Sequence, residues 1–495
     1  GRNIFPARRR PLLMIDEGVN LMDFQHRRVL GGNEKTATLY DAERMTLVRA
    51  PRDIVERALR YAHLGHGELE VSEADRESWA RIDAALQAGA SPIPPAAGEV
   101  AISKLIIGNT YHCNMGCSYC YNELDVKDRK GSEVPTGMSE ETALASIDAL
   151  FNQNAATGRF SIVFVGGEPL LEKPVLYRAV DYARERAARE EKKIDFSVYT
   201  NGTLMNKEVI KWAGENRVSL VVSLDGPPVL NDKHRVYLSG RPTSKAVLRN
   251  IRKLVESGTQ DVLRVRAVAA ENTPLVALHQ YLLDLGFNEI HVQPAYGEDG
   301  IAAGSTEDES LALLEWYRKS LLAGTIVSVM PFEGFIERIL MRGRATASWY
   351  PCSAGRTALG VGPDGEIYPC HHFLEEGTFS MGNVRRGLPL LNDRAPFFQR
   401  VDEREPCNSC WARHACGGEC YHRAHTGGAG YTGVLPDTCH RRKGLIGLTL
   451  EVLAELVAAN PSALKRVLNK QYSTVVPNEA AYEYKDLTPY LPVSS

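Results

Sequence analysis

The chain has 495 residues, with a hydrophobic fraction of 44%, a charged fraction of 24% and a formal net charge of −3. This length exceeds what a single ordinary core supports, so we expect two or three domains of a soluble globular protein. The small net charge gives no support for binding to nucleic acid or to an anionic membrane, and no apolar run approaches the ~18 residues of a membrane span.

Residues 1–98 are predicted to form a small α+β domain of their own. Ser72 is a plausible N-cap, because a serine side chain can accept a hydrogen bond from the first turn of a helix. Prolines within 88–98 indicate a linker to the next domain. The basic N-terminus lacks the apolar core of a secretory signal, which favours a cytoplasmic location. The expected elements are a strand over 12–15, a hairpin over 36–49 and helices over 51–63 and 72–86.

Strands and helices alternate over residues 99–330, which indicates an α/β domain. Six such units with nearly continuous apolar strands favour a parallel sheet covered by helices. Six units fit a partial (β/α)6 TIM barrel better than the eight of a full barrel, and chemistry in such folds gathers at the carboxyl ends of the strands. The expected strands are 102–108, 160–165, 194–199, 218–223, 262–269 and 289–294, and the expected helices are 139–156, 173–192, 206–216, 243–258, 274–285 and 307–322.

Ten cysteines fall into two groups, which in a cytoplasmic chain indicates metal ligands before disulfides. Seven lie between residues 352 and 439, and three form a C-x3-C-x2-C motif directly after the first barrel strand. Three thiolates can hold three irons of a [4Fe–4S] cluster and leave the fourth iron open, as catalytic metal sites do. A zinc site with a distant fourth ligand is the alternative, since thiolates suit both metals. The three residues are Cys113, Cys117 and Cys120.

The C-x3-C-x2-C motif, followed by the aromatic Tyr121, resembles that of the radical S-adenosylmethionine (radical SAM) superfamily. The resemblance implies that the open iron binds the methionine end of S-adenosylmethionine. It also implies that the reduced cluster cleaves this cofactor to a 5′-deoxyadenosyl radical, which takes a hydrogen atom from an unactivated C–H bond.

Polar motifs at the ends of later strands also match the superfamily. Gly166-Gly167-Glu168 resembles the GGE motif that holds the amino group of S-adenosylmethionine, and its glycines let the backbone approach a ligand closely. Ordinary turn chemistry or a surface ion pair is the alternative for these motifs. The further contacts that the resemblance implies are Tyr119 near the adenine, Thr200, Asn201, Ser223 and Asp225 near the ribose or the carboxylate, and Arg235, from a D-x-x-R motif, on the carboxylate.

The rear cysteines follow the pattern C…G-x4-C…C-x2-C-x5-C-x3-C…C over 352–440, which resembles the SPASM domain. For a domain over 331–445, the resemblance implies two auxiliary [4Fe–4S] clusters, so that three clusters use all ten cysteines. A pair of zinc ribbons is the alternative. The implied ligands are Cys407, Cys410, Cys416 and Cys439 for the outer cluster, and Cys352, Cys370 and Cys420 for the inner cluster.

The chain has no further cysteine to give to the inner cluster. We therefore predict an open or non-cysteine fourth position there. A substrate thiolate is one occupant, and His371, His372 or a water molecule is the alternative. An apolar helix over 445–457 and a tail make up the last region, 446–495.

The order of an N-terminal domain, a partial barrel and a SPASM domain resembles that of peptide-modifying enzymes. The strands and short helices of 1–98 resemble a winged-helix peptide-recognition element, although an unrelated extension that packs on the barrel fits equally well. The stretch from Cys416 to His422, with Trp411 ahead of it, resembles the maturation enzymes of quinohemoprotein amine dehydrogenase. That family installs intrapeptide thioether bonds from Cys sulfur to side-chain methylene carbons of Asp or Glu in a small subunit.

The resemblance implies two kinds of partner: a peptide or small-protein substrate, with or without a leader segment, and a flavodoxin- or ferredoxin-type electron donor. Three alternatives stay open at this stage. They are another peptide cyclase (sactipeptide or ranthipeptide type) or epimerase, a sulfatase-maturing formylglycine-type dehydrogenase, and a non-catalytic zinc-ribbon binding protein. No residue is singled out as the proton acceptor.

Overall fold

The computed structural model describes residues 27–32, 34–64, 72–88, 100–120, 135–154, 156–270, 272–296, 306–340, 349–374 and 377–473, together with Pro477 and Tyr482. The strand expected over 12–15 and all but the first residue of the linker over 88–98 lie outside these residues.

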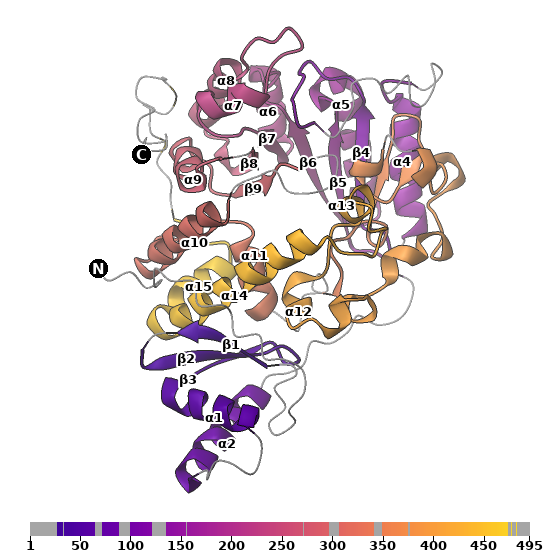
Figure 1. Ribbon diagram of the computed structural model, residues 1–495. Helices are drawn as coiled ribbons and strands as arrows, with labels where there is room; N and C mark the ends of the chain where they lie inside the picture. The colour runs from indigo at the N-terminus through magenta and orange to yellow at the C-terminus, as the bar shows by residue number, and fades with distance from the viewer. Residues whose placement is uncertain are drawn as a thin grey trace.

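A three-stranded antiparallel sheet opens the described chain, in the order β1-β2-β3 (Figure 1). The expected hairpin and both expected helices are present, and the Ser72 side chain accepts a hydrogen bond from Asp75 N at 3.1 Å, as an N-cap does. The first strand escaped prediction, because its six residues end in two glycines and do not alternate. The elements are β1 (Arg27–Gly32), β2 (Thr36–Asp41), β3 (Thr46–Pro51), α1 (Arg52–Leu64) and α2 (Glu73–Gln87).

The second sheet contains six parallel strands in sequential order, which confirms the predicted α/β partial barrel. Its strands are β4 (Lys104–Thr110), β5 (Arg159–Gly166), β6 (Lys193–Thr200), β7 (Val218–Ser223), β8 (Leu263–Ala269) and β9 (Ile290–Pro294). Its helices are α4 (Glu140–Gln153), α5 (Lys173–Arg189), α6 (Lys207–Glu215), α7 (Pro228–His234), α8 (Ser244–Glu256), α9 (Leu275–Asp284) and α10 (Glu307–Leu322).

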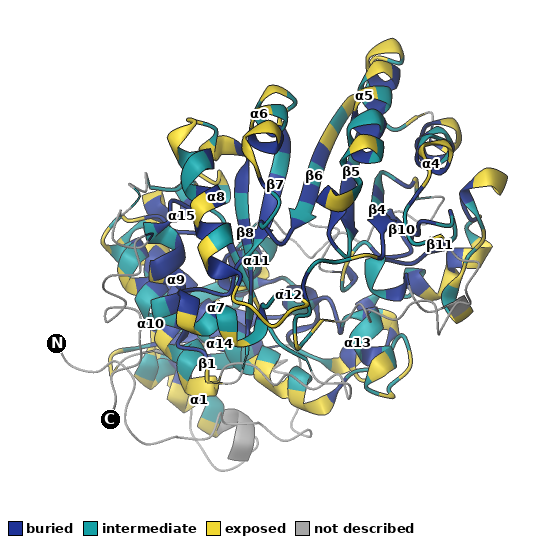
Figure 2. Ribbon diagram, turned by 90° about the horizontal axis from the view of Figure 1, so that it is seen from above, coloured by how far each residue is buried: buried dark blue, intermediate teal, exposed yellow. Residues whose placement is uncertain are grey.

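Alternation along the strands divides the sheet into an apolar face and a more polar face. On β8, Leu263, Val265, Ala267 and Ala269 are buried in the main core, whereas the residues between them keep some solvent access. Figure 2 shows α4, α5 and α6 along one side of the strands, with α12 and α13 toward the other side. The helices therefore cover the apolar face, and the opposite face is left for polar side chains.

Two short strands extend the barrel sheet at its β4 edge. β10 (Ala358–Val361) pairs in parallel with β4, and β11 (Ile367–Tyr368) pairs antiparallel with β10. The turn expected over 362–365 joins them, with Gly365 N donating to Gly362 O at 2.9 Å and Gly365 at φ +83°. Local sequence patterns do not reveal this pairing with β4, because β10 has only four residues and its partner lies about 250 residues earlier.

The last helices link the N-terminal sheet to the barrel. α14 packs against α10 and α11, and also against β1 and β3 (Figure 1). The expected helix over 445–457 is the second half of α14, which begins at a proline in its first turn and so includes Cys439. The elements are α11 (Phe332–Leu340), α12 (Arg413–Cys416), α13 (Tyr421–Thr426), α14 (Pro436–Ala459) and α15 (Pro461–Leu468).

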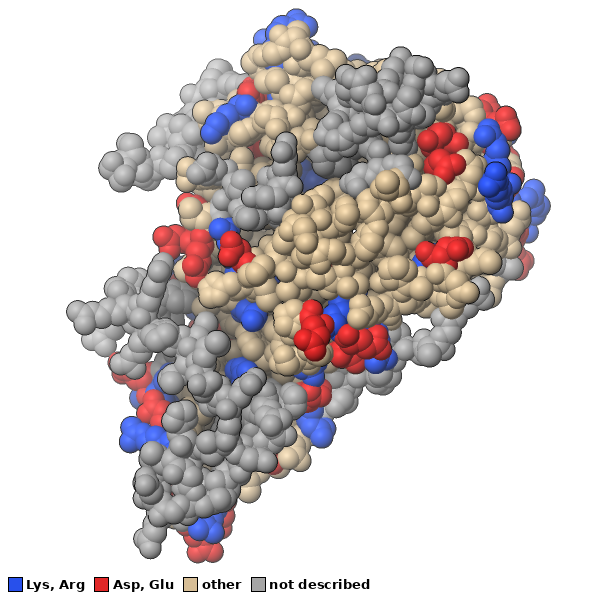
Figure 3. Space-filling model, turned by 45° about the vertical axis from the view of Figure 1, so that its right-hand side comes forward, with Lys and Arg blue, Asp and Glu red and all other residues tan. Residues whose placement is uncertain are grey.

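Within the described residues, no single helix is long and apolar enough to cross a membrane; α14 and α15 pass such a test only as a pair, which is bent by 118°. On the face in Figure 3, the described acidic and basic side chains lie in small mixed groups. The domain boundaries at 98, 330 and 445 stay predictions.

Candidate active site and metal centres

The three front cysteines lie in the loop that leaves the carboxyl end of β4. The loop is held by the end of α7 and the residues that follow it, where Ser118 N donates to His234 O at 3.2 Å and Gly116 N donates to Val236 O at 2.9 Å. Cys113 Sγ accepts a hydrogen bond from Met115 N at 3.4 Å. The loop is thus anchored to the carboxyl edge of the sheet, where the fold concentrates chemistry.

The thiols of this loop lie close enough to affect one another. Burial, with smaller contributions from the charges of Glu168, Cys117 and Cys120, raises the pKa of Cys113 to about 12. Burial likewise raises the pKa of Cys117, with a further contribution from Cys120. Thiols whose pKa is raised in this way need a bound cation to hold them as thiolates.

The rear cysteines also form two groups, because thiols within each group raise the pKa of other members of that group. Burial raises the pKa of Cys370, and so do Cys420 and Cys352. Cys352 keeps solvent access, yet crowding by protein atoms and the nearby Cys420 raise its pKa to about 11. The second group consists of Cys407, Cys410, Cys416 and Cys439. Burial and the charges of the other three thiols raise the pKa of Cys407 to about 11.

The structure therefore gathers the ten thiols as three, three and four, in the groups that the resemblance implied. Among the described residues, no three His, Cys, Asp or Glu side chains converge closely enough to hold a single metal ion. Groups of three or four thiols suit an iron–sulfur cubane, whose irons each take one thiolate.

Glu168 is fully buried at the end of β5 and ties that strand to β6. Its Oε1 accepts hydrogen bonds from Leu170 N at 3.1 Å and from the Thr200 hydroxyl at 2.7 Å, and its Oε2 accepts one from Asn201 N at 2.7 Å. Burial raises its pKa to about 7, although these hydrogen bonds oppose the shift. Two carboxylate oxygens have about four acceptor positions, so Oε2 keeps capacity for an ammonium group.

The two glycines before Glu168 serve a contact that the sequence did not reveal. A Cβ at Gly166 would lie 2.2 Å from Thr110 O, and one at Gly167 would lie 2.0 Å from His112 O. Gly167 N donates to Thr110 O at 2.9 Å, and Glu168 N donates to His112 O at 2.8 Å. The glycines thus let β5 approach the chain that leads into Cys113, whereas we had expected them to approach a ligand.

Asn201 connects the GGE segment to the cysteine loop. Its Nδ2 donates to Asn114 Oδ1 at 2.8 Å and lies 3.8 Å from Cys113 Sγ. Thr203 completes the connection, because its hydroxyl accepts from Asn114 Nδ2 at 2.9 Å. Asn201 therefore lies beside the front thiols, as the predicted cofactor contact requires.

Asp225 and Arg235 form a buried ion pair, with Arg235 Nε 3.0 Å from Asp225 Oδ2. The Tyr119 hydroxyl also donates to Asp225, and the Arg235 guanidinium lies 5.5 Å from the centre of the Tyr119 ring. Burial lowers the pKa of Arg235, but the charges of Asp225, Tyr119 and Cys117, together with the hydrogen bond to Asp225, outweigh it and raise the net pKa. The structure thus brings these three predicted cofactor residues together beside Cys117, whose pKa Arg235 lowers.

The acid of the D-x-x-R motif has a role in the fold. Asp232 Oδ1 accepts hydrogen bonds from Thr243 N at 3.1 Å and Ser244 N at 2.9 Å, so it caps α8 from a distance. Ser223, the last residue of β7, lies partly buried opposite Arg266 of β8. It therefore faces the same edge as the other predicted contacts.

The inner rear group lies beside a cluster of aromatic rings. The His371 and His372 rings are 4.3 Å apart, and those of His372 and His422 are 5.1 Å apart. Burial lowers the pKa of His371 to about 3, with a further contribution from Arg266, so its imidazole is neutral at pH 7. Neutral imidazoles of this kind can ligate iron, which keeps them available as the predicted alternative to a substrate thiolate.

The outer rear group is supported by residues that the sequence reasoning missed. Arg442 Nη1 donates to Gly418 O at 2.6 Å and lies 3.7 Å from Cys416 Sγ. Arg442 follows Cys439 by three residues on α14, so the helical spacing alone signalled that both project from one face. The N-terminal sheet also reaches this region, with the rings of Tyr40 and Trp411 6.1 Å apart.

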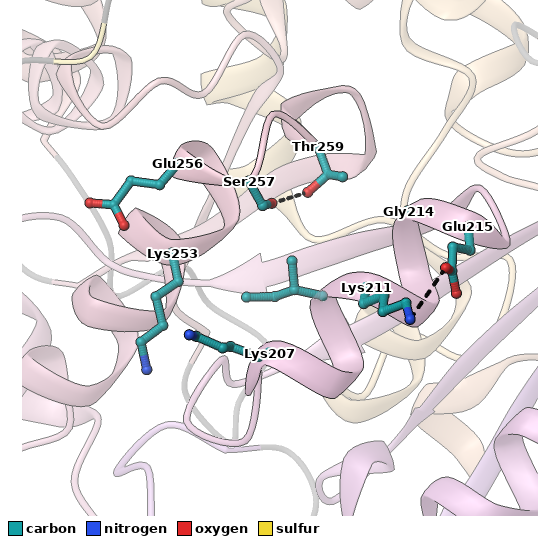
Figure 4. Close-up of a pocket in the computed structure, with 9 residues that line it drawn as sticks. Lys207, Lys211, Gly214, Glu215, Lys253, Glu256, Ser257 and Thr259 are labelled. Atoms are coloured by element: carbon teal, nitrogen blue, oxygen red, sulfur yellow. Dashed lines mark hydrogen bonds and ion pairs between the residues drawn. The ribbon is translucent and has the colours of Figure 1, made fainter.

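A surface hollow of about 680 Å³ lies elsewhere, between α6 and α8 (Figure 4). Lys207, Lys211 and Lys253 project around it, and Ser257 and Thr259 are hydrogen-bonded at its rim, 2.6 Å apart. It lies in the outer helical layer and includes none of the cysteines. We therefore place the site at the cysteine loop and not in this hollow.

Known proteins share these features. A model of the radical SAM superfamily matches residues 110–268, and a model of the SPASM iron–sulfur cluster-binding domain matches residues 352–411. A serine-type anaerobic sulfatase-maturating enzyme of Klebsiella aerogenes is 26% identical over 334 residues, which cover 64% of this chain and 78% of that protein. A cysteine-type anaerobic sulfatase-maturating enzyme of Clostridium perfringens is 24% identical over 338 residues, which cover 64% and 88%.

The fold is also found in solved structures. The structure of native anSMEcpe with bound AdoMet has a TM-score of 0.60 and 22% identity, and the match covers 72% of this chain and 99% of that one. The structure of native anSMEcpe with bound AdoMet and Cp18Cys peptide has a TM-score of 0.58 and 21% identity, over 74% and 99%.

Proposed function

We propose that this radical SAM enzyme with a C-terminal SPASM domain modifies a peptide by forming thioether bonds. Membership of this family excludes a non-catalytic zinc-ribbon protein. The bonds would join a Cys sulfur to a side-chain methylene carbon of Asp or Glu within one small protein, as in the maturation of quinohemoprotein amine dehydrogenase. The observation that carries this proposal is the inner group of three thiols. Cys352, Cys370 and Cys420 use the last cysteines available, so one ligand position is left for a substrate thiol.

A protein substrate is supported by the relatives. Their names describe the maturation of sulfatases, and one solved neighbour holds a peptide together with AdoMet. We propose a substrate of the same class here, with a flavodoxin- or ferredoxin-type protein as the electron donor. We also propose a cytoplasmic location, because iron–sulfur ligation by ten thiols requires a reducing compartment.

The front site fits S-adenosylmethionine and a cluster with an open iron. When bound, this pair supplies a 5′-deoxyadenosyl radical that removes a hydrogen atom from a C–H bond of the substrate. Cys113, Cys117 and Cys120 would hold the cluster, and Glu168 would accept the amino group of the cofactor. Arg235 and Ser223 would bind the carboxylate of S-adenosylmethionine. The Arg235 guanidinium would then pair with two carboxylates, that of the cofactor and that of Asp225.

A second function is favoured by the relatives themselves. Sulfatase-type maturation oxidises a single Ser or Cys side chain of the substrate and forms no bond between residues. The two reactions differ in their products. A thioether leaves the sulfur in the peptide, removes two hydrogens and consumes one thiol, whereas oxidation of a Ser side chain removes two hydrogens and leaves every thiol intact. Oxidation of a Cys side chain to an aldehyde removes the sulfur.

Anaerobic incubation with S-adenosylmethionine, reductant and peptides encoded beside the gene, read by mass spectrometry, tests the proposal. We expect the loss of two hydrogens per bond and of one alkylatable thiol per bond. A Cys→Ala peptide is the matched control and should keep its mass. Loss of sulfur would establish the sulfatase-type reaction instead, and 5′-deoxyadenosine release with every peptide unchanged would refute both.

Metal analysis tests the three clusters separately. We expect about twelve irons per chain and a visible absorbance near ~400 nm. Cys370→Ala should remove iron from the inner cluster and keep the signals of the other two. An inner cluster that needs a fourth cysteine of this chain would contradict the open position.

A further inference from the structure

Arg266 is a cation on the polar face of the barrel without an acidic partner among the described residues. It lies on β8, where it pairs in register with Ser223 of β7 on one side and His291 of β9 on the other. Its guanidinium lies 4.8 Å from the centre of the Tyr199 ring of β6. This stacking orients the guanidinium and leaves its N–H groups free to bind a ligand.

The neighbouring arginines show that this arrangement is unusual within the barrel. Arg264, two residues earlier on the same face of β8, pairs with Glu289 at 3.1 Å. Arg235 pairs with Asp225 at 3.0 Å. A partly buried charge without a counter-charge is costly, so an anion that pairs with it is stabilised.

The charge of Arg266 affects groups on three other segments. Besides burial, its charge lowers the pKa of Lys104, of His291, and of His371 beside the inner cysteine group. These residues come from β4, from β9 and from the 3₁₀ turn His371–Phe373. Arg266 therefore lies between the edge that carries Ser223 and the segment that carries Cys370.

We propose that Arg266 binds the side-chain carboxylate of the substrate Asp or Glu. The planar guanidinium matches a carboxylate with two parallel hydrogen bonds. The reacting methylene carbon is attached to that carboxylate or lies one carbon away. Anchoring the carboxylate thus positions this carbon between the cofactor edge and the inner cysteine group. This inference rests on the proposed function, because a substrate without an acidic side chain offers nothing for Arg266 to bind.

Binding of a fluorescent substrate peptide to the reconstituted enzyme, with S-adenosylmethionine and without reductant, tests the inference. We expect Arg266→Gln to raise the peptide Kd by at least about 30-fold, the loss typical of removing one partner of a desolvated charge pair. Arg266→Lys should raise it less, because lysine keeps the charge and loses the planar fork. An Asp→Asn peptide should bind the wild type about as weakly as the acidic peptide binds Arg266→Gln, with no further loss when the two changes are combined.

Arg264→Gln is the matched control, on the same strand and face, and should leave the peptide Kd unchanged. Iron content and 5′-deoxyadenosine release without peptide report that each variant is folded and loaded. A weaker Kd for S-adenosylmethionine with unchanged peptide binding would assign Arg266 to the methionyl carboxylate and overturn the inference, as would equal losses in Arg264→Gln. If the wild-type enzyme crosslinks no peptide, the proposed function itself is refuted. If the wild type and Arg266→Gln crosslink the peptide equally well, only this inference is refuted.

Discussion

We expect Gly167→Ala to destabilise the protein and to disrupt the front cysteine loop. An added Cβ would lie 2.0 Å from His112 O, 2.3 Å from the His112 carbonyl carbon and 2.7 Å from Tyr111 O. These are backbone atoms, which cannot rotate away as the end of a side chain could. The hydrogen bond from Glu168 N to His112 O, at 2.8 Å, holds the two segments at this distance.

The magnitude follows from the kind of obstacle. Forcing extra atoms into a packed region typically costs 1–3 kcal/mol, and a backbone obstacle belongs at the upper end, so we expect a loss of about 3 kcal/mol in the free energy of unfolding. That is a large share of the ~5–15 kcal/mol that a native protein has. Since His112 precedes Cys113, any shift that relieves the contact also moves a cluster ligand.

Urea unfolding and iron analysis check this prediction together. Gly158→Ala is the matched control, because a Cβ at Gly158 has no atom within 4 Å and the residue directly precedes the same strand. Its stability should stay within about 0.5 kcal/mol of the wild type. If Gly167→Ala matched this control in stability and kept a full front cluster, the chain before Cys113 would be freer to move than the structure implies.

Three further predictions follow from the buried charges. Burial raises the pKa of Glu168 to about 7 from 4.5, so between these pH values the cofactor-free folded state keeps a proton that the unfolded chain releases. The free energy of unfolding should therefore fall by about 3 kcal/mol as the pH rises from about 4.5 to 7. Glu168→Gln should flatten this pH profile, as measured by urea unfolding. Arg235→Gln leaves Asp225 buried without a counter-charge and should lower the free energy of unfolding by about 3 kcal/mol or more. Adding Asp225→Asn should restore much of this loss. Equal stability of the single and double variants would contradict the prediction. Arg442→Gln removes a hydrogen bond at the outer group and should weaken its EPR signal, whereas the exposed neighbour Arg441→Gln should not.

The barrel could be predicted because each of its strands carries its own signal. Apolar runs such as Phe160–Val165 and the cysteine spacing are local features, and they predicted six strands and two cysteine groups, whereas the division of the rear group came from the family resemblance. The pairing of β10 with β4 depends on chain segments about 250 residues apart, which no local pattern reports. The glycines of the GGE motif were placed at the right strand end, but their partner is the backbone of Thr110 to His112. The hydrogen bonds from Asp232 to the start of α8 could not be predicted, because they are visible only in three dimensions.

The segment of the inner cysteine group and the segment that leads into the front loop are joined by two sets of contacts. The Tyr111 hydroxyl donates to Leu374 O at 3.2 Å, and the Leu374 side chain fills the space where a Cβ of Gly108 would lie, 2.7 Å away. Tyr111 lies two residues before Cys113, and Leu374 lies four after Cys370. Because β10 also pairs with β4, separating the two thiol groups would break strand hydrogen bonds as well as this packing. The front loop and the inner cysteine segment are therefore held together by strand pairing as well as by side-chain packing.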